Sequence, residues 1–148
     1  MTDLNRSLPC RESELNKALE SLHFAFRRVI ARPDAILLEH GLSRLHQRIL
    51  YFVGRNRGLS ISDLLAILNI TNQSLNAPLR QLLQRDFIVF VPDETDRRIK
   101  RLVLTHSGAI LENELSGDQR ARFEKVFQQV GPECELAWRK VMGLLAEF

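Results

Sequence analysis

The chain has 148 residues and a mass of 17.1 kDa, with 45% hydrophobic and 26% charged residues. This length and composition fit one globular domain with a buried core and exclude a disordered chain. No apolar run approaches the roughly 18 residues that a membrane span needs, and the first residues lack the apolar core of a signal peptide, so we expect a soluble, cytoplasmic protein.

Positive charge is concentrated in the middle of the chain. The formal net charge is +3, but residues 43–105 hold ten Lys or Arg against five Asp or Glu, while the rest holds eleven against thirteen. A local excess of this kind is typical of a surface that binds a polyanion such as DNA. Two distant cysteines, Cys10 and Cys134, and four scattered histidines lack ligand spacing, so we expect no metal site and no cofactor.

The N-terminal segment has apolar residues at helical spacing. They predict a helix from about Glu12 to Arg32, which Pro33 ends. Its inward face would consist of Leu15, Leu19, Leu22, Phe26, Val29 and Ile30. Ser43 is the predicted cap of a second helix, which ends at Gly58.

The end of this second helix carries a basic pair, Arg55 and Arg57. Two roles fit the pair: contact with a phosphate group, or charge complementarity with the helix dipole. The residues that face inward from the second helix are Leu45, Ile49, Phe52 and Val53.

The next segment has the start and stop signals of a short helix. Ser60 can cap the helix while Asp63 reaches back to the backbone of the cap residue, so the helix should begin near Ile61. Asn69, which tolerates positive φ, should end it. Its inward residues are Leu64, Leu65 and Leu68.

A further helix is predicted from a Thr71 cap to about Arg85, with Leu75, Leu79 and Leu82 inward. Its other face carries amides, small residues and a cation, which are the groups that read base edges in a major groove. The candidate DNA-binding residues there are Asn72, Gln73, Ser74, Asn76, Ala77 and Arg80. A solvated helix face has the same composition, so this stripe alone does not decide between the two roles.

Pro78 lies inside this predicted helix and removes one backbone hydrogen bond. Either the helix kinks there, or its regular part starts late with Asn76 as the cap, which puts Pro78 harmlessly in the first turn. In the second case Asn72 and Gln73 would lie on the preceding turn.

A β-hairpin is expected next. Its predicted strands are Phe87–Val91 and Ile99–Leu104, and the residues between them are turn formers. A basic tip of this kind suits a narrow minor groove, and Asp96 can orient one of the arginines through its carboxylate. The candidate DNA-binding residues of the hairpin are Asp96, Arg97, Arg98 and Lys100, with Arg101 close by.

The C-terminal segment predicts two helices. Thr105 caps a long one, which the sequence allows to bend at Ser116 and Gly117, and Gly131-Pro132 ends it. The last helix is more apolar than one face of a small monomer needs, with Leu136, Trp138, Val141, Met142, Leu145 and Phe148. The first and last helices can therefore pack on each other or form a homodimer, which suits a two-fold DNA site.

The order of these motifs resembles the MarR family of winged helix-turn-helix transcriptional regulators. The most specific part is Asp96-Arg97-Arg98 followed by Leu104-Thr105-x-x-Gly108, and residues 42–108 carry the motifs. Asp86 departs mildly from the family, which usually has glycine there, and aspartate tolerates a left-handed backbone. The resemblance implies a mainly α fold with a small β-hairpin wing, in which 43–105 bind DNA and helical regions 1–42 and 106–148 form the dimer.

The resemblance also implies a homodimer on a palindromic double-stranded DNA operator, with Arg98 in the flanking minor groove. Such regulators are most often repressors that release DNA when a small phenolic, lipophilic or carboxylic effector binds between the dimer helices and the DNA-binding lobe. In this chain the pocket lining could include Phe24, Arg27, His46 and Phe52, although aromatic residues at helical spacing are usually core.

Two alternatives remain within this fold. One is a thiol-based sensor that uses Cys10 and Cys134. The thiol sensors that this chain resembles also use tyrosines, and Tyr51 is the only tyrosine of this chain. The other is a winged-helix module that binds protein, which would need an apolar patch where the sequence has amides and arginines. We expect no enzyme, because the sequence contains no nucleophile motif and no phosphate-binding loop.

Overall fold

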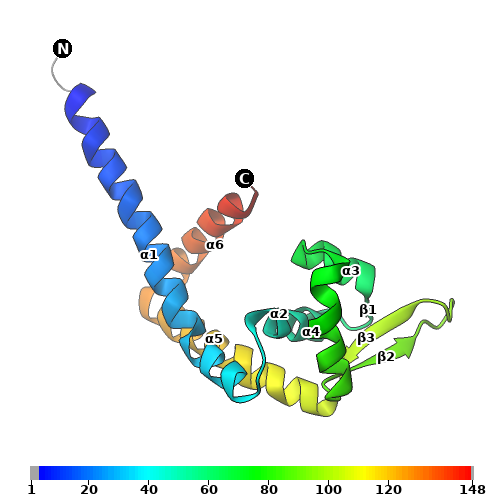
Figure 1. Ribbon diagram of the computed structural model, residues 1–148. Coiled ribbons are helices and arrows are strands. Elements are labelled where there is room, and N and C mark those ends of the chain that lie inside the picture. Colours follow the sequence, from blue (N-terminus) through cyan, green and yellow to red (C-terminus); the bar gives the residue numbers. More distant parts are fainter. Residues whose placement is uncertain (1–3, 148) are drawn as a thin grey trace.

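The computed structural model describes residues 4–147, and within them it contains six helices and one three-stranded antiparallel sheet (Figure 1). In chain order these are α1 (Leu4–Glu39), α2 (Arg44–Arg55), β1 (Leu59–Ser60), α3 (Ile61–Leu68), α4 (Asn72–Gln84), β2 (Ile88–Pro92), β3 (Lys100–Leu104), α5 (His106–Val130) and α6 (Pro132–Glu147). This order confirms the predicted winged helix-turn-helix with flanking helices. None of the described helices is long and apolar enough to cross a membrane.

The elements are arranged at two ends of α5. In Figure 1, α2, α3, α4, the sheet and the C-terminal end of α1 gather around the first half of α5, while α6 and the N-terminal part of α1 extend from the side of its second half. The sheet projects from the first group as an extended wing. Helix α5 therefore connects the winged helix-turn-helix to the terminal helices.

Helix α1 continues through Pro33, so the prediction that Pro33 ends the first helix is wrong. Proline lacks the N–H that would bond to the carbonyl of Val29, and Gln119 of α5 donates its Nε2 to that oxygen at 3.4 Å instead. Pro33 is fully buried, and this packing offsets the cost of its ring. The helix ends at Glu39, two residues before Gly41, whose φ is +66°.

Helix α3 begins and ends at the predicted residues. Ser60 Oγ accepts a hydrogen bond from the Asp63 N–H at 3.1 Å, and the Asp63 carboxylate accepts from the Ser60 N–H at 3.4 Å. This capping box starts α3 at Ile61. Asn69 has a φ of 51° and a left-handed backbone, which ends the helix as expected.

The wing contains one more strand than predicted. Strand β3 is central, with β2 on one side, where Ile88 pairs with Leu104, and β1 on the other, where Leu59 pairs with Leu102. The two residues of β1 are too few to show an alternating pattern, so sequence reasoning missed this strand. Because β1 leads directly into α3, the sheet is joined to the start of the helix-turn-helix.

The two C-terminal helices have the predicted boundaries. Thr105 Oγ1 accepts from the Gly108 N–H at 3.0 Å and starts α5, which then runs as one helix past Ser116. Gly131 has a φ of +91° and ends α5, and Pro132 opens α6. Proline suits this first helical position because its missing N–H would have no intrahelical partner there.

One hydrophobic core lies where the C-terminal end of α1, α2, α3, α4, the sheet and the first half of α5 meet. Each fully buried side chain of this size contributes about 1.5–3 kcal/mol to stability, so α4 is firmly held by its inward face. The core residues are Leu37, Leu42, Ile49, Leu50, Val53, Leu59, Leu64, Leu75, Leu79, Leu82, Ile88, Leu102, Leu111 and Leu115.

Candidate nucleic-acid interface

The outward face of α4 is exposed to solvent. Thr71 Oγ1 accepts from the Ser74 N–H at 3.1 Å, so α4 begins at Asn72 and the alternative of a late start at Asn76 is wrong. Its candidate DNA-binding residues are all exposed: Asn72, Gln73, Ser74, Asn76, Ala77 and Arg80. Pro78 is accommodated inside the helix, because the carbonyl that it leaves free belongs to the exposed Ser74.

The end of α4 is closed by a left-handed residue. Asp86 has a φ of 58°, and the Phe87 N–H donates to the Leu82 carbonyl at 3.0 Å, which satisfies one of the last carbonyls of the helix. The Asp86 carbonyl accepts hydrogen bonds from the hydroxyls of Thr105 and Ser107 at the start of α5. The Thr-x-x-Gly motif therefore joins α5 to the turn between α4 and β2.

The turn of the wing is organised by Asp93. Its carboxylate accepts from Thr95 Oγ1 at 2.8 Å, from the Asp96 N–H at 3.0 Å and from Arg101 Nε at 3.1 Å. The Thr95 hydroxyl, then the Asp96 amide and then Arg101 lower the pKa of Asp93 to about 2. Asp93 therefore stays ionised at neutral pH and keeps the turn closed.

Arg101 has a structural role that sequence reasoning did not assign. In addition to its ion pair with Asp93, its Nη1 donates to the Gly58 carbonyl at 3.3 Å, just before β1. Arg101 thus ties the wing turn to the residues that lead into α3. The charge pattern alone could not separate this arginine from its exposed neighbours.

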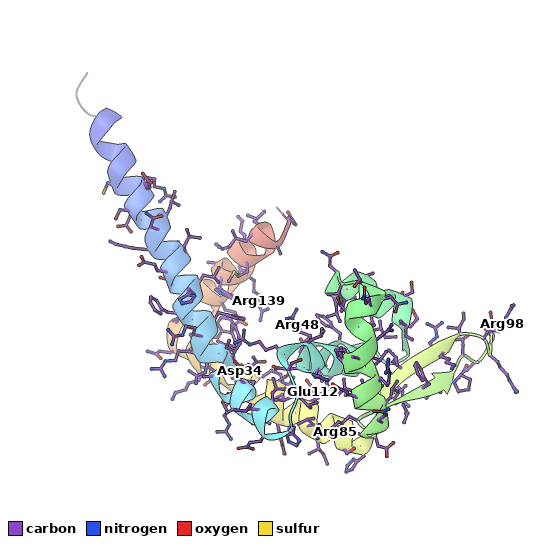
Figure 2. All side chains as sticks on the ribbon, viewed as in Figure 1. Asp34, Arg48, Arg85, Arg98, Glu112 and Arg139 are labelled. Carbon is purple, nitrogen blue, oxygen red and sulfur yellow. The ribbon has the colours of Figure 1, made fainter. Side chains whose placement is uncertain are left out.

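The tip of the wing presents its other cations to solvent. The Arg98 side chain is 92% exposed, and its Nε donates to the Asp96 carboxylate at 3.2 Å, which confirms that Asp96 orients an arginine. Figure 2 shows Arg98 at the far end of the wing, directed away from the helices. Arg97 is exposed, and the Lys100 ammonium lies 5.3 Å from the centre of the Phe90 ring. The exposed Arg98 side chain at the tip of the wing is therefore hydrogen-bonded to Asp96.

Arg55 lies in the last turn of α2, which fits the predicted charge complementarity with the helix dipole. Its guanidinium donates to Glu112 at 3.1 Å and lies 5.4 Å from the centre of the Tyr51 ring. Glu112 is only 4% exposed, and it also pairs with Arg120 at 3.3 Å. Arg55 therefore joins α2 to α5 while its side chain stays 42% exposed, and Arg57 is exposed as well.

Buried His46 connects α2 to the recognition-type helix α4. Its Nδ1 accepts from the Ser43 N–H at 2.9 Å, and its Nε2 lies 2.6 Å from Gln81 Oε1. Burial lowers the pKa of His46, the bond to Gln81 opposes this shift, and the charge of Arg85 adds to it. His46 is therefore neutral at physiological pH.

We expect the protein to lose stability as the pH falls below about 6.5, the ordinary pKa of histidine. Because the folded state lowers the pKa of His46, the unfolded chain binds the proton first. The stability that neutral His46 contributes is fully present above about pH 6.5 and is lost as the pH falls through the pKa of His46 in the folded protein. Urea unfolding from pH 8 to pH 5 should show a weaker pH dependence in His46→Gln. The exposed control His23→Gln should keep the pH dependence of the wild type. If His46→Gln also kept it, His46 would not be the source of the pH-dependent stability.

A cavity of about 520 Å³ lies where α1, α2 and α5 meet. Its lining combines aromatic and cationic groups: Phe26, Ile30, Arg44, Gln47, Arg48, Tyr51, Ser116 and Gln119. Figure 2 shows Arg48 on the side of α2 that faces α1. The four residues suggested for a pocket from the sequence do not line this cavity: Phe24 is exposed, His46 bonds to Gln81, Phe52 packs against the core, and Arg27 is exposed.

The two cysteines lie on the terminal helices. Cys10 in α1 and Cys134 in the first turn of α6 are both exposed free thiols. Within the part of the chain that the structure describes, no group of three or more His, Cys, Asp or Glu side chains could hold a metal ion. A role of these thiols in sensing oxidants stays a prediction.

Comparisons with known proteins agree with this geometry. The sequence profile of the MarR family matches residues 40–99, from the end of α1 to the wing. The HTH-type transcriptional regulator PetP of Rhodobacter capsulatus is 37% identical over 136 residues, which cover 92% of this chain and 82% of PetP. FabT of Streptococcus pneumoniae, solved in complex with DNA, has a TM-score of 0.77 at 21% identity over 90% of this chain and 96% of FabT.

A second solved structure has the same fold with a small molecule bound. NadR in complex with 4-hydroxyphenylacetate has a TM-score of 0.69 at 23% identity over 86% of this chain and 91% of NadR. The fold, the profile match and the identity to PetP lead to one assignment. The chain belongs to the MarR family of winged helix-turn-helix transcriptional regulators, which are DNA-binding proteins and not enzymes.

Proposed function

We propose that the protein is a homodimeric repressor that reads a palindromic DNA operator and releases it when a small molecule binds. One observation carries the DNA-binding part: the polar face of α4 and the Arg98 tip of the adjoining wing are both exposed. The local excess of positive charge in residues 43–105 supports the same surface. We assign 43–105 to DNA binding and 1–42 with 106–148 to the dimer.

The two elements would have different tasks on the duplex. Amides such as Asn76 pair with adenine edges, and Arg80 pairs with guanine, so α4 would enter the major groove and read sequence. Arg98 and Arg97 would enter the flanking minor groove, where a narrow A·T tract attracts guanidinium groups. Ser74 and Lys100 would contact the DNA backbone, while Asp96 would act through Arg98, whose Nε donates to its carboxylate.

A dimer is supported by apolar surface that the protomer leaves uncovered. On α1, Leu19 is 68% exposed, and on α6, Leu136 is 71% exposed, so the protomer leaves both side chains open to a partner. No residue of α6 is buried. A second copy that brings α1 and α6 together would bury these faces and place two α4 helices about one duplex turn apart.

We expect sedimentation equilibrium at micromolar protein to give a mass near twice 17.1 kDa. Leu19→Lys should weaken the dimer at least about tenfold, since it puts a charge in place of a leucine whose burial in the dimer would be worth about 1.5–3 kcal/mol. The control Ile67→Lys, on α3, removes a half-exposed apolar residue from the other end of the protein and should leave the mass unchanged. A monomeric wild type that binds a palindrome tightly would contradict the dimer.

The cavity between α1, α2 and α5 supports release by a small anionic aromatic compound. Arg44 is already bound by the Asp34 carboxylate at 2.8 Å, so Arg48 is the cation of the lining that can bind a ligand carboxylate, and Phe26 with Tyr51 can contact a ring. Helix α2 carries these arginines on one side and His46, which bonds to α4, on another. A ligand that shifts α2 would therefore also displace α4.

A footprint on the DNA that flanks the protein's own coding region tests this function. We expect two protected half-sites about one duplex turn apart, and loss of protection with 4-hydroxyphenylacetate, the compound bound in NadR. Arg48→Leu should give the same footprint but respond less to the compound. If none of the flanking fragments is protected, the protein has no operator beside its own coding region. If protection persists with 4-hydroxyphenylacetate, this compound is not the effector. If peroxide releases the wild type from DNA but does not release Cys10→Ser, the result favours a thiol-based sensor instead.

A further inference from the structure

The hydrogen bonds around His46 fix how the amide of Gln81 points. The Ser43 N–H donates to Nδ1 of His46, so the imidazole proton of the neutral ring must lie on Nε2. Nε2 then donates to Gln81 Oε1 at 2.6 Å. Because the carbonyl oxygen of the amide faces His46, its NH₂ group is directed to the other side, away from α2.

That other side belongs to the outward face of α4. Gln81 is exposed and follows Gln73 and Ala77 at intervals of four residues, so it continues the same helical stripe by one more turn. The orientation of the C-terminal end of α4 is fixed by Arg85, whose Nη1 donates to the His40 carbonyl just after α1 at 2.6 Å. The Gln81 side chain is thus bound to His46 near the end of a helix that is itself tied to the residue after α1.

We propose that Gln81 is a further DNA contact of α4 that acts only as a hydrogen-bond donor, and that His46 is the residue that positions it. A free glutamine amide can offer either its oxygen or its NH₂, but the oxygen of this one is bound to His46, which leaves the NH₂ group as the part that it offers. It therefore suits an acceptor on DNA, either a phosphate oxygen or a purine N7 or O6 atom. The proposal rests on the proposed operator binding by α4.

Titration of the footprinted operator with four proteins tests the contact. Gln81→Ala should weaken binding about two- to tenfold, the range of one lost hydrogen bond. Gln81→Glu should weaken it more, because its carboxylate can still accept from His46 but repels the acceptor on DNA. Gln128→Ala, on α5, removes a glutamine far from α4 and should match the wild type.

The role of His46 is tested by a double-mutant cycle. His46→Ala should weaken DNA binding in the wild-type background but not in the Gln81→Ala background, with urea unfolding used to confirm that each variant is folded at the assay temperature. Equal weakening in both backgrounds would overturn the positioning role. If His46→Ala does not fold, the comparison of Gln81→Ala with Gln81→Glu decides the contact by itself.

The outcomes separate this inference from the proposed function. A wild type that binds no operator refutes the proposed function. A wild type that binds, together with Gln81→Ala and Gln81→Glu variants of unchanged affinity, refutes the contact alone. A loss that is uniform across operators with altered base pairs assigns the acceptor to a phosphate, and a loss that disappears at one altered pair assigns it to that base.

Discussion

Gly108→Ala is expected to destabilise the protein by about 3 kcal/mol or more, the upper range for overpacking a core. A Cβ at Gly108 would lie 1.9 Å from the Phe87 carbonyl oxygen, and the atom that it meets is backbone, which cannot turn aside. Gly108 is also buried, so relief requires that α5 move away from the turn after α4. This close approach gives a physical reason for glycine in the Thr-x-x-Gly motif.

Urea unfolding with a matched control measures this effect. Gly143→Ala, in α6, makes the same chemical change where nothing lies within 4 Å of the added carbon. It should be neutral or stabilise by up to about 1 kcal/mol, because alanine favours a helix over glycine. Equal unfolding midpoints for Gly108→Ala and the wild type would show that α5 does not pack against Phe87 as described.

Arg98→Ala is expected to weaken operator binding about tenfold or more and to reduce the slope of log affinity against log salt by about 1. The side chain is 92% exposed and is held by Asp96 at the tip of the wing, so its loss removes one pre-positioned cation and leaves the fold intact. The pairing with Asp96 also predicts that Asp96→Ala causes a smaller loss, since Arg98 then keeps its charge but not its orientation.

Salt titrations with a charge-matched control test the assignment of the wing. Lys125→Ala removes one positive charge from an exposed position on the second half of α5, away from α4 and the wing, and should leave affinity and salt slope nearly unchanged. Wild-type affinity of Arg98→Ala at every salt concentration would rule out a contact between the wing tip and DNA.

Local signals in the sequence predicted the helix boundaries of the DNA-binding lobe. Ser60 with Asp63, Thr71 and Thr105 each form the cap that their spacing indicates, and Asn69 adopts the left-handed backbone. Such caps depend on residues three positions apart, which makes them visible in the sequence. Pro33 misled the prediction because a distant contact offsets its cost.

The candidate site was predicted less completely than the fold. The exposed residues of α4 and the wing follow from helical and hairpin periodicity, and the structure leaves them exposed. The hydrogen bonds of His46 to Gln81 and of Arg101 to Gly58 join residues 35 and 43 positions apart. The cavity is likewise lined by residues of three separate helices, α1, α2 and α5. Contacts of this kind depend on tertiary packing, which no local pattern encodes.

Cleavage of DNA from a reagent attached to the wing tests the central claim most directly. In a Cys10→Ser, Cys134→Ser background, Arg97→Cys offers one thiol beside Arg98 for a copper-phenanthroline group, which cuts DNA from the minor groove. The account predicts two clusters of cuts in the minor groove, symmetric about the centre of the operator and outside the half-sites that α4 protects. Cuts scattered along the duplex, or a single cluster, would contradict a two-fold reader whose wing and α4 share one DNA surface.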